Sequence, residues 1–131
     1  ALLFIKILNV DLFREAYGFV AADDLLRAIA RILQDALRDQ GTASDFLGQI
    51  SPNDFIIRTH KSKISIMKDS LSHRLDHSFD YFYRDQDRQS PDFQSHRLSA
   101  LFCEIDPTQS GAINAQNLKE IMEAAARQAK H

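Results

Sequence analysis

The sequence contains a single cysteine, Cys103, so it cannot form an internal disulfide. This residue lies in an apolar run, which favours a buried structural thiol in a reducing compartment over a nucleophile. Excess charge is also lacking, because 16 Lys and Arg are balanced by 18 Asp and Glu, giving a formal charge of −2. This balance gives no indication of a nucleic-acid or anionic-membrane partner.

Long apolar stretches are missing as well. No run approaches the roughly 20 residues of a membrane-spanning helix, and no charged segment precedes the apolar start as in a signal peptide. We therefore expect a cytoplasmic protein whose sequence makes no membrane contact. The sequence has no initiator methionine and opens inside a strand-like run, so we expect a piece of a longer protein.

What the sequence does contain is enough apolar material for one packed core. Its 131 residues are 44% hydrophobic and 26% charged, which is typical of a globular chain. A chain of this length supports one domain, so we expect residues 1–131 to form a single unit. Neither an internal repeat nor a low-complexity segment divides it.

The apolar pattern predicts alternating strands and helices. Continuous or alternating apolar runs predict strands at 2–8, 46–50, 54–59 and 98–105. Helical spacing predicts two helices within 11–37, broken at Gly18, and further helices at 64–79 and 114–130. Polar residues make 83–96 an expected irregular excursion. The order βααββαβα predicts an α+β or α/β layered domain with one sheet.

Several segments, taken in this order, resemble the GGDEF domain of diguanylate cyclases. They are 2–10, Tyr17-Gly18, 22–27, 46–55, the late strand 98–102 and the last helix 124–130. The hairpin carries the family signature in an altered form, which runs Ser51-Pro52-Asn53-Asp54-Phe55. The resemblance implies a nucleotide-cyclase-like domain with a central, mostly antiparallel sheet flanked by helices.

In this family, two GTP molecules held by two facing domains condense to cyclic di-GMP with the help of metal ions. Such ions need acidic oxygen ligands. The resemblance places the first metal carboxylate at Lys6, whose ammonium repels a cation, and the second at Asn53, a weaker neutral ligand. Within the signature, Asp54 retains a carboxylate at the fourth position, and Phe55 retains the phenylalanine of the fifth.

The nucleotide-binding positions are altered too. The two signature glycines fall on Ser51 and Pro52, and proline also removes an N–H donor. The Asn and Asp that recognise guanine correspond to Arg14 and Asp23. Asp23 has a second explanation, because a carboxylate near the start of a helix suits the helix dipole.

Two further family sites correspond to residues 42–45 and to Lys130 of this chain. The inhibitory Arg-x-x-Asp motif corresponds to residues 42–45, where Thr42 replaces the arginine and Asp45 remains. The loss of the arginine removes the guanidinium that can form two parallel hydrogen bonds with a phosphate or a guanine edge. Lys130 matches a phosphate-binding lysine, although a single lysine at a helix end is usually only solvated.

Three other patterns favour ordinary structural roles. Residues 106–113 resemble half of an EF-hand loop, but Asn117 stands where a bidentate Glu is needed, so we expect no calcium site. His73 and His77 share a helix face, with Asp76 and Asp80 nearby. No glutamate of an HExxH motif accompanies the two histidines and no cysteine is close in sequence, so a solvated face is the preferred interpretation. The aromatic triplet 81–83 predicts packing or a contact patch.

The preferred function is therefore a catalytically inactive GGDEF-like module that regulates or contacts other parts of a bacterial cyclic-di-GMP-type signalling protein. Its partner would be another protein or a domain of the same chain, with a homodimer left open, weak or absent nucleotide binding, and no cofactor or metal. Two alternatives remain: a diguanylate cyclase with an unusual active site, and a GTP receptor without turnover. We also expect Lys6, in its apolar strand, to pair with a carboxylate, Asp54 being the first choice.

Overall fold

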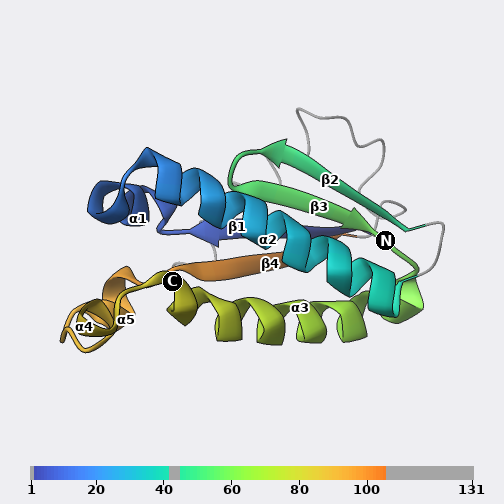
Figure 1. Cartoon of the computed structure of the whole chain (residues 1–131). Helices are drawn as coiled ribbons and strands as arrows, with labels where there is room; N and C mark the ends of the chain where they lie inside the picture. Colours follow the sequence, from blue (N-terminus) through green and yellow to red (C-terminus); the bar gives the residue numbers. More distant parts are fainter. Residues whose placement is uncertain (1, 42–44, 106–131) are drawn as a thin grey trace.

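A four-stranded sheet forms the centre of the computed structural model, which describes residues 2–41 and 45–105 (Figure 1). In the order in which they lie side by side, the strands are β2 (Phe46–Ser51), β3 (Asp54–Arg58), β1 (Leu2–Leu8) and β4 (Ser99–Ile105). Every neighbouring pair is antiparallel. The predicted α+β fold and its strands are therefore confirmed.

β1 is a central strand, which pairs with β3 on one side and with β4 on the other. Alternate residues of a strand point to opposite faces of the sheet, and Leu3, Ile5 and Ile7 are fully buried on the face covered by helices. On the other face Phe4 is buried, whereas Lys6 is half-buried. The face of β1 that the helices cover is therefore fully buried, whereas the opposite face is buried only in part.

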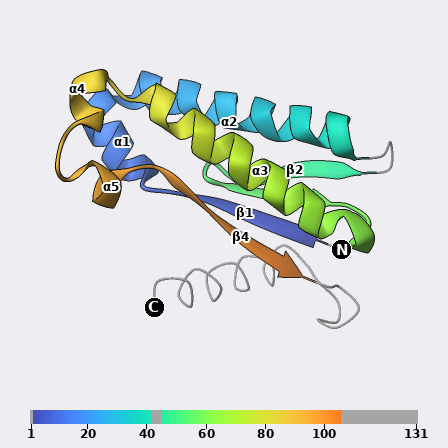
Figure 2. The ribbon, with the colours of Figure 1, turned by 90° about the horizontal axis from the view of Figure 1, so that it is seen from below.

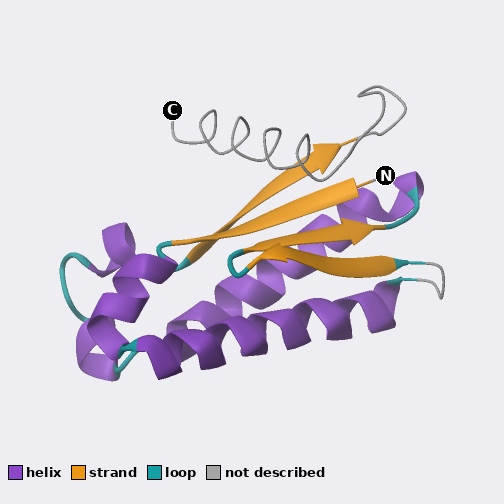
Figure 3. Ribbon diagram, turned by 90° about the horizontal axis from the view of Figure 1, so that it is seen from above, coloured by secondary structure: helices purple, strands orange, loops and turns teal. Residues whose placement is uncertain are grey.

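The long helices cover one face of the sheet (Figures 2 and 3). The helical elements are α1 (Val10–Tyr17), α2 (Phe19–Gln40), η1 (Lys61–Lys63), α3 (Ile64–Phe79), η2 (Asp80–Phe82), α4 (Asp85–Arg88) and α5 (Phe93–His96). The break between α1 and α2 falls at Gly18, whose φ of 94° favours glycine. The apolar residues that recur with helical spacing along α3 form a buried stripe: Ile64, Met67, Leu71, Leu75 and Phe79.

The segment between α3 and β4 is more ordered than the sequence indicates. It was expected to be irregular, but it contains the single-turn helices α4 and α5. Its aromatic rings anchor it, since Tyr83 packs edge-on against Phe13 and Phe93, with ring centres 5.5 and 5.0 Å away. Tyr81 remains 72% exposed, so the predicted packing role applies to only part of the triplet.

Cys103 is less buried than the sequence predicts. Its side chain is half-buried, on the sheet face opposite the helices, and not fully buried. Burial raises the pKa of the thiol above its ordinary value, which disfavours the reactive thiolate.

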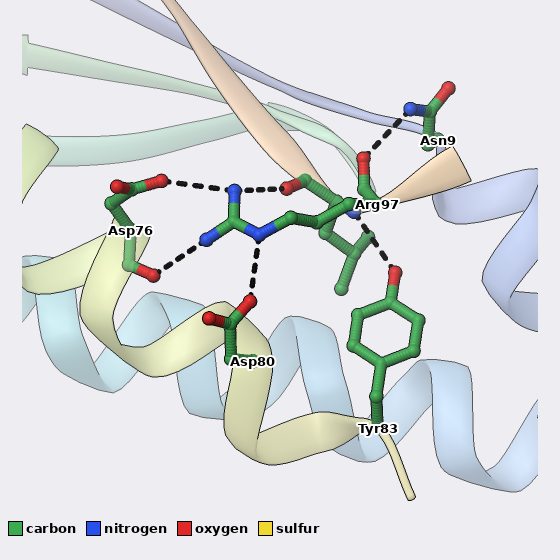
Figure 4. A network of polar contacts seen from close by, with 6 residues as sticks. Asn9, Asp76, Asp80, Tyr83 and Arg97 are labelled. Carbon is green, nitrogen blue, oxygen red and sulfur yellow. Dashed lines mark hydrogen bonds and ion pairs between the residues drawn. The ribbon is translucent and has the colours of Figure 1, made fainter. Parts of the chain in front are cut away.

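A network around Arg97 joins the end of α3 to the start of β4 (Figure 4). The guanidinium donates to the Asp80 carboxylate at 2.7 Å and to the Asp76 carbonyl at 2.8 Å. It also forms an ion pair with the Asp76 carboxylate at 3.0 Å. Burial alone would lower the pKa of Arg97, but the hydrogen bonds to the two carboxylates outweigh this effect and raise it.

The same network reaches the end of β1. The amide of Asn9, which has a left-handed φ of 69°, donates to the Arg97 carbonyl at 2.8 Å. The Tyr83 hydroxyl accepts from the backbone N–H of Leu98 at 2.9 Å. These bonds fix the chain as it enters β4.

The predicted helix 114–130 and the EF-hand-like segment 106–113 lie outside the described residues. Over the part of the chain that the structure does describe, no helix is both long and apolar enough to cross a membrane.

Replacing Tyr83 with Phe should lower the free energy of unfolding by about 1–2 kcal/mol, because the buried Leu98 N–H loses its acceptor. The matched Tyr81→Phe variant should change it little. Burial raises the pKa of Tyr83, so the unfolded chain loses this proton first and wild-type stability falls as the pH rises past about 10. Urea unfolding at pH 7 and 10.5 checks both effects. Equal stability of the two variants at pH 7 would contradict the assigned role of Tyr83.

Candidate functional site

The altered signature forms a tight turn between two strands of the sheet. Ser51 ends β2, Asp54 begins β3, and the two residues between them make the connection. Proline fixes φ near −65° at Pro52, and Asn53 does not adopt a positive φ, so this is not one of the mirror-image turns that two-residue hairpins prefer. A register shift between Gln49 and Ser51 accompanies this turn.

Lys6 and Asp54 face each other across the sheet. They are direct partners in the antiparallel pairing of β1 with β3. The Lys6 Nζ atom lies 3.5 Å from Asp54 Oδ1, which is an ion-pair contact and not a directed hydrogen bond. The predicted pair is therefore confirmed. Its side chains are 34% and 19% exposed, so it is only partly buried.

The turn holds the Asp54 carboxylate from the other side as well. The Ser51 hydroxyl donates to Asp54 Oδ2, so both carboxylate oxygens already have a neighbour within the protein. The Asn53 carbonyl accepts from the Ile7 N–H at 2.9 Å, which ties the turn to β1. The side-chain oxygen of Asn53 is buried and, among the described residues, has no hydrogen-bond donor.

The guanine-recognition positions are separate from this pair. Arg14 forms an ion pair with Asp11, one helical turn earlier in α1, at 2.8 Å. Its guanidinium also lies 5.8 Å from the centre of the Phe19 ring. Asp23 is exposed in the second turn of α2, because that helix starts at Phe19. The expectation that Asp23 lies near the start of the helix is therefore wrong, because Asp23 lies one turn farther along α2.

Other predicted positions are placed as follows. Asp45 accepts a hydrogen bond from the buried Thr59 hydroxyl at 3.0 Å, a structural contact that sequence reasoning missed. Thr42 and Lys130 lie outside the described residues. His73 and His77 are exposed beside a hollow of about 310 Å³ that is also lined by Asp35.

The residues present do not suit a divalent metal ion. Lys6, to which the sequence resemblance assigns the first carboxylate, supplies an ammonium that pairs with Asp54. The remaining donors of the turn are the Ser51 hydroxyl and the Asn53 amide, which bring no negative charge. Mg²⁺ in protein sites relies on carboxylates. No group of three or more His, Cys, Asp or Glu suited to a metal occurs in 2–41 or 45–105.

Comparison with solved structures identifies the fold. The chain is similar to the active GGEEF domain of a diguanylate cyclase from Vibrio cholerae, with 20% identity and a TM-score of 0.50, over 77% of this chain and 58% of that one. It is also similar to the GGDEF domain of DgcB from Caulobacter crescentus in complex with c-di-GMP, with 13% identity and a TM-score of 0.57, over 98% of this chain and 70% of that one.

The protein therefore has the fold of GGDEF diguanylate cyclase domains, as the sequence resemblance implies. It spans 58% of the length of the Vibrio protein chain. No family model and no curated protein matches the sequence.

A double-mutant cycle should detect the ion pair. Lys6→Met alone should change stability little or increase it, while Asp54→Asn alone should cost about 1–2 kcal/mol, because it leaves a partly buried ammonium unpaired. Combining them should reveal a coupling of about 0.5–1.5 kcal/mol. The exposed pair Arg38 and Asp35 is the control, with weaker coupling expected. Urea unfolding measures all variants, and a coupling of zero between Lys6 and Asp54 would contradict the assignment.

Proposed function

We propose that this domain is a catalytically inactive GGDEF-like module that acts through contacts with another protein or with further domains of its own chain. The observation that carries the proposal is the ion pair between Lys6 and Asp54. In the resemblance, Lys6 stands at the position of the first metal carboxylate. The Lys6 ammonium at this position forms an ion pair with Asp54, the carboxylate that the turn retains.

The positive charge of Lys6 supports inactivity more strongly than the loss of a carboxylate ligand alone would. Replacing a carboxylate with an ammonium changes the charge beside the ion by two units. Two unit charges 4 Å apart interact by about 4 kcal/mol at the effective dielectric constant typical of a protein surface. A divalent ion at this position would meet repulsion in place of attraction.

The turn also hinders a nucleotide. Pro52 has no N–H to offer a phosphate, and Ser51 adds a side chain where the family signature has glycine. Arg14, at the position of a guanine-reading amide, is held by Asp11. The signalling system, the partner and the cytoplasmic location are proposals that rest on the fold and the sequence resemblance.

The protein should make no cyclic di-GMP from GTP with Mg²⁺ or Mn²⁺ in an assay that resolves the product by chromatography. The Lys6→Asp, Asn53→Glu double variant should remain inactive, since Pro52 and Arg14 are unchanged. Turnover by the wild-type chain that disappears in the Asp54→Ala variant would refute the proposal, because it would show a working site built on that carboxylate.

A further inference from the structure

A second hollow lies beside the end of α1, and none of the signature residues 51–55 lines it. Its volume is about 280 Å³, just below the range of roughly 300–1,000 Å³ typical of pockets for drug-sized ligands. It is lined by the end of α1 and by the segment that contains α4 and α5, the part of the chain whose order the sequence did not predict. A hollow of this size suits a small metabolite.

Three aromatic rings line it. Tyr17 and Tyr83 meet edge to face, with ring centres 5.9 Å apart, and Tyr83 meets Phe93 in the same way at 5.0 Å. Aromatic faces carry partial negative charge and attract cations. The protein already uses one of these faces, because the Arg84 guanidinium lies 5.4 Å from the centre of the Tyr17 ring.

The charges around the hollow also favour a cation. Asp87 and Asp92 line it, and Arg84 is the one side chain with a permanent positive charge among its lining residues. His96, whose Nδ1 atom lies 3.0 Å from the Asp92 carbonyl, adds no charge while it is neutral. The lining therefore carries a net charge of −1.

The charged side chains that line the hollow have no ion-pair partner among the described residues. Asp87 accepts a hydrogen bond from the Tyr17 hydroxyl, but neither Asp87 nor Asp92 pairs with a cationic side chain within the described ranges. Arg84 is exposed and likewise has no carboxylate partner in those ranges. The neighbouring Asp85, by contrast, is paired with Arg88.

We propose that this hollow binds a small organic cation of the ammonium class. The cation would lie against the rings of Tyr17, Tyr83 and Phe93, and the carboxylates of Asp87 and Asp92 would balance its charge. Arg84 then acts as a competing resident cation on the Tyr17 face. This site is independent of the proposed loss of catalysis at the signature turn.

Choline and its uncharged analogue of the same shape, 3,3-dimethyl-1-butanol, test the proposal on the full 131-residue chain. Choline should produce saturable amide shifts in 84–96 and at Tyr17 in ¹⁵N-correlated NMR spectra, with a dissociation constant of millimolar order. The alcohol should bind at least about fivefold more weakly, since it lacks the cation–π and ionic attraction. Equal binding of the two would overturn the proposal, as would the absence of any saturable shift with choline.

Charge variants separate a cation site from an anion site. Asp92→Asn should weaken choline binding about three- to fivefold, whereas Asp85→Asn, which removes the same charge outside the lining, should leave it unchanged. Arg84→Gln should strengthen choline binding because it removes the resident cation. Inorganic phosphate is the opposing probe. Saturable phosphate binding that is lost in the Arg84→Gln variant, or weaker choline binding in that variant, would overturn the proposal.

Discussion

The register of β1 at the centre of the sheet is the constraint on which the other features depend. Leu3, Ile5 and Ile7 fill the core beneath the helices, and a shift by one residue would turn all three to the opposite face. That register also places Lys6 directly across from Asp54 on one side and from Leu101 on the other. The ion pair between Lys6 and Asp54 is therefore held in position by the hydrophobic core, and a change in the core would disturb it.

The end of β1 connects this pair with the rest of the molecule. The Ile7 N–H bonds to the Asn53 carbonyl of the signature turn, and two residues later the Asn9 side chain bonds to the Arg97 carbonyl before β4. Arg97 in turn holds the end of α3. Tyr83, fixed by the Leu98 N–H, contributes a wall of the aromatic hollow. The turn and the hollow are thus supported by one continuous set of backbone and side-chain contacts, which gives each a defined shape.

The sequence predicts the parts of this fold that depend on local periodicity. The β1 run and the α3 stripe, such as Met67 and Leu71, are confirmed because strand and helix repeats are visible within a few residues. The pairing of Lys6 with Asp54 is also predictable from the sequence, because an ammonium in an apolar strand needs a partner and the hairpin supplies a carboxylate. The hollow was missed, since Tyr17 and Asp87 are 70 residues apart and only the folded chain brings them together. Asp23 was expected near the start of α2, but the helix already begins at Phe19. Phe19 and Val20 are exposed apolar residues, which give no core-facing signal in the sequence.

The proposed inactivity rests on the ion pair between Lys6 and Asp54, where the sequence resemblance places a metal carboxylate. Paramagnetic Mn²⁺ added with GTP probes this site, because the ion broadens NMR signals only near the place where it binds. We expect the amide signals of residues 6–9 and 51–55 to keep their line widths relative to those of the exposed face of α3. Selective broadening at Lys6 and the 51–55 turn, reversed by excess Mg²⁺ with GTP, would contradict it.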